Sequence, residues 1–149
     1  MASKLHVFIS LLLLKIFVVI INLGFTSGFN AFLTHTWRKD HQDRNNHDRV
    51  ARINEGLKSQ GITTWFDSDK LNGEIYTQMT NGIEKSQCVV VFMTEEYMNK
   101  VNGDETRDPC RFEFNFAFQR HGRNKIFPVL MENSKPEEEM RKTVQYKDW

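Results

Sequence analysis

One carboxylate, Glu113, lies among four phenylalanines in the stretch DPCRFEFNFAF, residues 108–118. The phenylalanines stand at every second position, and aromatic neighbours lower the local dielectric around an acid. A carboxylate that is held in a low-dielectric setting interacts strongly with a developing positive charge. The type and setting of Glu113 therefore make it the first candidate for a chemical role.

Two patterns in this stretch predict different secondary structures. Strict alternation of apolar and polar residues is typical of a half-buried strand. Asp108 and Pro109, however, are a favoured helix N-cap and first helical residue, and Gly122 is a favoured stop. We give the caps more weight and expect a helix from Asp108 to Gly122. In that helix Glu113 and Ala117 share a face between two phenylalanine faces, both of which would need cover.

Strand-like and helix-like segments alternate along the chain. Short apolar runs predict four strands, at residues 29–35, 62–66, 88–93 and 125–131. Periodic apolar residues predict a helix closed by Gly61 and a second one running to Ser86. The run CVVVFM is apolar on both faces, as a central strand of a parallel sheet must be. We therefore expect an α/β fold with its site beyond the carboxyl ends of the strands.

Composition narrows the class of protein. The 149 residues suffice for one domain with its own core, and a formal net charge of +1 gives no case for a nucleic-acid partner. Two cysteines, Cys88 and Cys110, do not make a disulfide framework. Cys110, near the expected helix start, invites a lowered thiol pKa, but a structural thiol is the better interpretation because no resolving partner is visible.

The histidines and glycines do not form a recognisable metal-binding or phosphate-binding motif. His35, His41 and His47 are each six residues apart, which fits neither one helix face nor a zinc pattern. No metal site is expected. The sequence also contains no glycine-rich phosphate-binding loop of the P-loop or Rossmann type.

The N-terminal residues 1–28 form a segment of different character from residues 29–149. Leu5–Phe25 is almost wholly apolar, with Lys15 in its middle, and about 20 apolar residues span a bilayer. We favour a hydrophobic membrane-anchor helix with the domain in the cytoplasm. A signal peptide, and a wrongly joined gene start that would leave a cytoplasmic protein, are the alternatives.

Four stretches together resemble the TIR domain, the Toll/interleukin-1 receptor module. They are FNAFLTHTWRKD, the long stretch from GITTWF to TEEYM, CRFEFNFA and IFPVLME, which cover Phe29 to about Glu132. The resemblance implies a flavodoxin-like parallel sheet flanked by helices. The family's last strand and helix would then be missing, because the chain stops at Trp149 where they would be expected. Pro109 departs from the family pattern, because it replaces a tryptophan.

The resemblance implies a role in signal transduction of the innate-immune type. Such domains act by associating with other TIR domains, and the docking segment is the BB loop. Its counterpart here consists of Asp69, Lys70, Leu71, Asn72 and Gly73. Asn72 stands where many relatives have proline, which restores a backbone N–H and frees φ, so we expect a more mobile loop.

The resemblance also implies a second function, because some TIR domains hydrolyse NAD at the nicotinamide–ribose bond. The catalytic glutamate of those enzymes falls on Glu113, and no cofactor is required. The NAD-binding positions would be Thr34, Trp37, Arg38 and Phe66. In the alternative interpretation Glu113 catalyses no reaction and only forms hydrogen bonds with the backbone of an adjacent loop.

Overall fold

Helices and strands alternate along the chain, as the sequence patterns predict. The computed structural model describes residues 28–66 and 75–132. Its elements are β1 (Phe29–Thr34), α2 (Asn46–Ser59), β2 (Thr64–Phe66), α3 (Ile75–Glu84), β3 (Ser86–Met93), α4 (Glu95–Asn102), α5 (Pro109–His121), the 3-10 turn η1 (Arg123–Lys125) and β4 (Ile126–Leu130). All four predicted strands are present: β1, β2 and β4 are shorter than predicted, whereas β3 begins two residues earlier, at Ser86.

The described strands form one parallel sheet in the order β2-β1-β3-β4. Leu33 of β1 aligns with Val90 of β3, and Val90 aligns with Phe127 of β4. β3 is buried along almost its whole length, as predicted for a central strand. The α/β prediction is confirmed.

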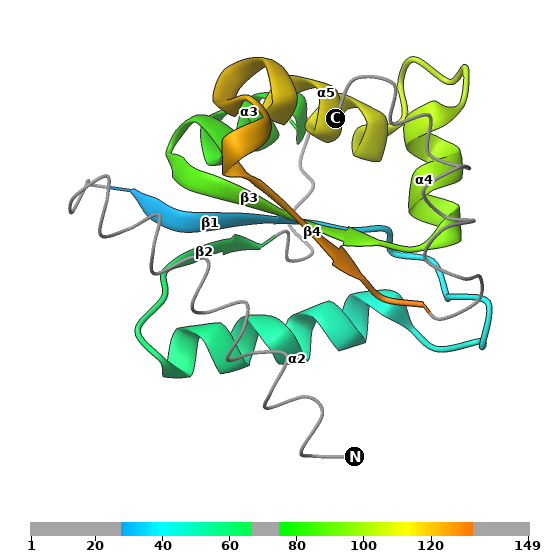
Figure 1. The fold of residues 1–149 in the computed structure, drawn as a ribbon, viewed down its shortest axis with the longest axis horizontal. Helices are drawn as coiled ribbons and strands as arrows, with labels where there is room; N and C mark the ends of the chain where they lie inside the picture. The colour runs from blue at the N-terminus through cyan, green and yellow to red at the C-terminus, as the bar shows by residue number, and fades with distance from the viewer. Residues whose placement is uncertain (1–27, 67–74, 133–149) are drawn as a thin grey trace.

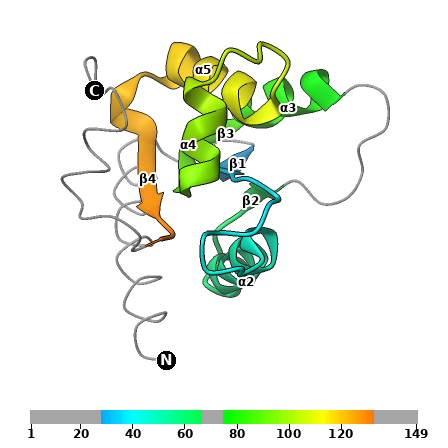
Figure 2. The ribbon, with the colours of Figure 1, turned by 90° about the vertical axis from the view of Figure 1, so that its right-hand side faces the viewer.

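Helices cover both faces of the sheet (Figures 1 and 2). α2 lies on one face, where its stripe of Val50, Ile53 and Leu57 is buried against β1 and β3 as predicted. α3, α4 and α5 contribute to the apolar cluster on the opposite face. The chain thus leaves the neighbouring strands β1 and β3 towards opposite faces, and a crevice is expected at their carboxyl ends.

The stretch that opens with Asp-Pro is the helix α5, so the caps outweigh the alternating pattern. The Asp108 carboxylate accepts the Cys110 backbone N–H at 2.8 Å, and Gly122 ends the helix with φ of 67°. The face that points inward carries Cys110, Glu113 and Ala117. The helix therefore buries its one carboxylate.

The phenylalanines of α5 flank this buried face and are only partly covered. Phe112 and Phe116 stack on each other with ring centroids 5.9 Å apart, whereas Phe118 is 36% exposed. The expectation that both phenylalanine faces are covered is therefore only partly met, since the inward face of the helix lies between them.

Helix α4 was not predicted from the sequence. It follows β3 directly, and the Thr94 side chain caps it by accepting the Tyr97 backbone N–H at 3.1 Å. Glu95 and Glu96 in its first turn and Lys100 in its last turn complement the helix dipole. These signals are present in the sequence, but the helix has only eight residues.

Buried charge fixes the β1–α2 loop, residues 35–45, to the end of β4. The Asp40 side chain is fully buried and accepts Arg44 Nε at 2.6 Å and Arg49 Nη1 at 2.7 Å. Arg49 also donates to the Met131 carbonyl at 2.8 Å. Buried polar groups need such partners, so this loop is held rather than free.

Glu132 makes a second connection at the same end of the sheet. Its carboxylate is 2% exposed and accepts the backbone N–H of His41 at 2.9 Å and of Glu95 at 2.7 Å. The β1–α2 loop, the end of β4 and the start of α4 are thus tied together.

Several predictions fall outside the described residues. These are the Leu5–Phe25 segment, the BB loop Asp69–Gly73, and the missing final strand and helix. Within residues 28–66 and 75–132, no helix is long and apolar enough to cross a bilayer. Membrane anchoring stays a prediction.

Replacing Asp40 by Asn should destabilise the fold. Burial would raise the pKa of Asp40, but hydrogen bonds from Arg44 and Gln42 lower it below its usual value. We expect a loss of about 2–3 kcal/mol in the free energy of unfolding at pH 7, near the lower limit for a broken buried ion pair because both guanidiniums stay partly in water.

A group with a lowered folded-state pKa contributes its stability above its unfolded pKa and loses it as the pH falls through the folded value. The difference between wild type and Asp40→Asn should therefore be constant above about pH 5 and shrink below about pH 4. Urea unfolding across this range measures it. The control is Asp43→Asn, at an exposed ion pair with Lys39. Equal stability of Asp40→Asn and wild type would contradict the role of the loop contacts.

Candidate functional site

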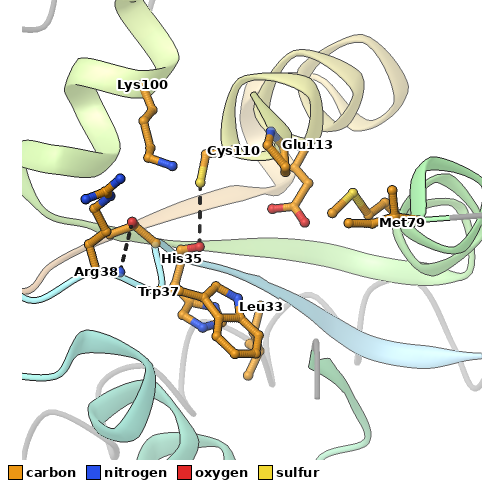
Figure 3. A pocket seen from close by; sticks show the side chains of 11 residues that line it. Leu33, His35, Trp37, Arg38, Met79, Lys100, Cys110 and Glu113 are labelled. Carbon is orange, nitrogen blue, oxygen red and sulfur yellow. Dashed lines mark hydrogen bonds between the residues drawn. The ribbon is translucent and has the colours of Figure 1, made fainter. Parts of the chain in front are cut away.

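A cavity of about 280 Å³ opens at the carboxyl end of β1 (Figure 3). Its walls come from β1, the β1–α2 loop, α3, α4 and α5. They are formed by Leu33, His35, Thr36, Trp37, Arg38, Ile75, Met79, Lys100, Pro109, Cys110 and Glu113. The volume is close to the lower limit of small-molecule sites, about 300 Å³. The cavity lies at the β1/β3 end, where an α/β sheet is expected to bind its ligand.

Glu113 reaches the cavity from α5 and is 6% exposed. Its Oε2 accepts the Thr34 hydroxyl at 2.5 Å, and the same hydroxyl oxygen lies 3.1 Å from the Tyr97 hydroxyl. Thr34 is 1% and Tyr97 0% exposed. A carboxylate that accepts a hydrogen bond from Thr34 therefore borders a partly open cavity, where it can face a cationic group of a ligand.

Aromatic rings form one wall beside this carboxylate. Trp37 stacks on His47 with ring centroids 4.0 Å apart, and Phe66 stacks on both His35 and His47 at 5.2 Å. His35 Nε2 and His47 Nδ1 are hydrogen-bonded at 2.8 Å. Trp37, 45% exposed, thus presents an indole that is supported from behind.

The His35 ring is electrically neutral at physiological pH. Burial, followed by the nearby His47, lowers the pKa of His35 to about 3, although a hydrogen bond with the Leu33 backbone opposes this. His35 therefore contributes shape and stacking to the cavity, but no positive charge.

Two cationic side chains border the cavity. Lys100 of α4 pairs with Asp108 at 3.0 Å, and Arg38 of the loop pairs with Glu96 at 3.4 Å. The Arg38 side chain is 74% exposed, so this ion pair is weak and can be exchanged for an anionic ligand. Each cation at the rim is thus paired with a carboxylate, and the Arg38 pair is the more exposed of the two.

The structure brings together most of the residues that the sequence singled out. Trp37, Arg38 and Glu113 line the same cavity, and Thr34 reaches it through Glu113. Phe66 lies in the ring stack behind Trp37. The BB loop residues lie outside the described part of the chain.

Sequence reasoning missed several contributors to the site. Lys100 could have been found from the cap and charge signals of α4. The spacing of His35 and His47 carries no such signal, because their contact depends on how the loop folds back. Among the described residues, no group of three or more His, Cys, Asp or Glu could hold a metal ion.

Both cysteines are buried. Burial raises the pKa of Cys88 to about 12, and burial and the Glu113 charge raise the pKa of Cys110 well above its usual value. The lowered thiol pKa considered for Cys110 is therefore wrong: although the residue lies in the first turn of α5, it packs against the sheet. The interpretation as a structural thiol agrees with this burial.

We expect both thiols to resist labelling in the folded protein. At pH 8 a thiol with a raised pKa holds very little thiolate, so the reaction with a disulfide reagent should be at least about a hundredfold slower than in denaturant. Absorbance after addition of the reagent measures it, and the denatured chain, which releases two equivalents, is the control. Rapid labelling of Cys110 in the native protein would contradict its burial.

The comparisons with known proteins agree with this architecture. The family model described as TIR domain matches residues 32–149, most of the chain and beyond the stretch that ends at Glu132. No curated protein and no solved structure gives a significant match. The parallel order β2-β1-β3-β4 is that of the flavodoxin-like sheet. Because the family model matches more than half of the chain, the chain belongs to the TIR domain family.

Proposed function

We propose that this chain is a signalling protein that acts by associating with other TIR domains, either copies of itself or different ones. The family match supports this function, because TIR domains act in signal transduction, including innate immunity. The docking segment in this proposal is the BB loop, Asp69–Gly73. In sequence it lies between β2, which ends at Phe66, and α3, which begins at Ile75, a residue that lines the cavity.

In this proposal the TIR domain faces the cytoplasm and Leu5–Phe25 attaches it to a membrane. The apolar composition of that segment is the supporting observation. Fractionation of the tagged full-length chain tests it: an uncleaved product that remains wholly soluble would rule out the attachment.

Substitutions in the BB loop should weaken the association. Gly73→Ala and Asn72→Ala should each lower the affinity between TIR domains by about tenfold, the effect of a central interface position. Pull-down between two differently tagged copies measures it, and Gln60→Ala, at an exposed position after α2, is the control. Unchanged capture by both loop variants would overturn the proposed docking.

The geometry of the cavity favours a second function, hydrolysis of NAD at the nicotinamide–ribose bond. The observation that carries it is Glu113: a carboxylate, 6% exposed, that lines a partly open cavity and is held by a hydroxyl donor. The buried carboxylates of Asp40 and Glu132 hold the β1–α2 loop, whereas Glu113 borders a space that a ligand can enter, which makes it the candidate for a functional acid.

In the proposed reaction the Glu113 carboxylate stabilises a positive charge that develops on the ribose. The bond between the nicotinamide nitrogen and the ribose C1′ breaks, and its electron pair neutralises the pyridinium ring, which leaves as nicotinamide. The ribosyl group becomes an oxocarbenium cation, which water attacks with loss of a proton to give ADP-ribose. Glu113, as a fixed anion, stabilises the cation electrostatically.

The rest of the cavity suits the remainder of the substrate. Trp37 offers a supported ring for stacking on a base, and Arg38 offers an exposed guanidinium for a phosphate. Phe66 acts indirectly, by packing behind the rings that hold Trp37. NAD is the substrate in this proposal, and no cofactor is required.

Glu113→Gln should abolish most of the NAD cleavage. We expect a loss of about 10²–10³-fold in kcat, the usual effect of removing one preorganised electrostatic group from a transition state. The assay follows nicotinamide released by the concentrated full-length chain. Glu55→Gln, on the opposite face of the sheet, is the control and should be unchanged. Equal release by Glu113→Gln and wild type would contradict the assignment.

A further inference from the structure

We propose that Tyr97 is a positioning residue that acts through Thr34 to hold and orient the Glu113 carboxylate. Its catalytic consequence rests on the proposed NAD hydrolysis, whereas the arrangement itself does not. Tyr97 is 0% exposed, so it cannot touch a ligand in the cavity and can influence the site only through its neighbours.

The direction of the hydrogen bonds follows from counting hydrogens. A threonine hydroxyl carries one hydrogen, and Thr34 donates it to Glu113 Oε2 at 2.5 Å. The Thr34 and Tyr97 hydroxyl oxygens are 3.1 Å apart, so in this hydrogen bond Tyr97 must be the donor and Thr34 the acceptor. The three groups therefore form a relay in which Tyr97 donates to Thr34 and Thr34 donates to Glu113.

The contact from Thr34 to Glu113 is the shorter of the two, at 2.5 Å against 3.1 Å between the two hydroxyls. A hydroxyl that donates to a carboxylate is expected to approach its acceptor more closely than one that donates to another hydroxyl. Both hydroxyl dipoles point at the carboxylate, and in a buried setting such aligned bonds reinforce each other.

The phenol remains a donor at all pH values of interest. Burial, followed by the charges of Cys110 and Glu113, raises the pKa of Tyr97 well above its usual value. Tyr97 therefore keeps its hydrogen at neutral pH and can act as the donor to Thr34.

The relay also fixes geometry, because its members come from three elements. Thr34 ends β1, Tyr97 lies in the first turn of α4 after β3, and Glu113 lies on α5. The position of the carboxylate is thus fixed by contacts at the ends of two adjacent central strands, β1 and β3, as well as by its own helix. Such a second layer of contacts is what holds a catalytic group in a productive position.

Other ionisable groups face the same region. They are Lys100 and Asp108 as an ion pair, Cys110, His35 and Arg38. Burial, together with the neighbouring charges, raises the pKa of Cys110 and lowers that of His35 to about 3. His47, hydrogen-bonded to His35 at 2.8 Å, is a further ionisable ring beside the cavity. The Glu113 midpoint is therefore compared between each variant and wild type, which all keep His47.

Carbon NMR of the full-length chain, labelled at the glutamate side-chain carboxyl, tests the relay directly. The Glu113 signal is assigned by its loss in Glu113→Gln. We expect Thr34→Val, which has the same shape without the hydroxyl, to raise the titration midpoint of Glu113 by about one pH unit. Tyr97→Phe should raise it by a smaller amount, and Thr34→Ser should restore the wild-type midpoint.

Kinetics give the second readout. With NAD as substrate, Thr34→Val should lower kcat about tenfold and Tyr97→Phe about threefold, while KM stays within about twofold, because the relay acts on the transition state rather than on binding. The acid limb of the kcat profile should move to higher pH in both variants, and Thr34→Ser should behave as wild type.

The possible outcomes distinguish the proposed hydrogen-bond relay from the proposed NAD hydrolysis. Midpoint shifts without any NAD cleavage leave the relay standing and reject the hydrolase. Cleavage by wild type with unchanged midpoints in both Thr34→Val and Tyr97→Phe rejects the relay. Circular dichroism checks that each variant folds, and if Thr34→Val does not, the isosteric Tyr97→Phe still decides: an unchanged midpoint overturns the relay.

Discussion

A single hydrogen bond, from the Thr34 hydroxyl to the Glu113 carboxylate, determines how the rest of the site is arranged. It joins the end of the central strand β1 to α5 and requires the helix to turn its acidic face inward. An acid on that face would be costly without a donor. Because the Thr34 hydroxyl donates to it, the carboxylate can remain buried at the edge of a cavity rather than exposed in solvent.

Around this contact, buried ion pairs and hydrogen bonds hold the β1–α2 loop in place. The β1–α2 loop would normally vary in position, but Asp40 and Glu132 secure it to β4 and to α4. As a result, the Trp37 ring stacks on His47, and Arg38 lies at the rim of the cavity. A signalling role needs only the surface of the domain, whereas a role in NAD chemistry would use this preorganised interior, and the two functions are compatible in one chain.

Much of the fold could be predicted from the sequence, because strand lengths, helix caps and the Asp-Pro pair are local signals. The strands and α5 follow from them, and so does the place of Glu113. What could not be predicted depends on long-range contact: the inward face of α5, and the meeting of His35 with His47, which requires the loop to fold back on itself. Helix α4 was overlooked because eight residues give little periodicity, although its caps were present.

The most direct test of the site is a titration of the labelled full-length chain with NAD, followed by the indole N–H signals of its three tryptophans. Trp37 is on the cavity wall, whereas Trp65 packs against Phe32 of the sheet and serves as an internal reference. If the cavity holds NAD, the Trp37 signal moves in a saturable way and the Trp65 signal moves much less. A Trp37 signal that stays in place at saturating NAD contradicts the central claim.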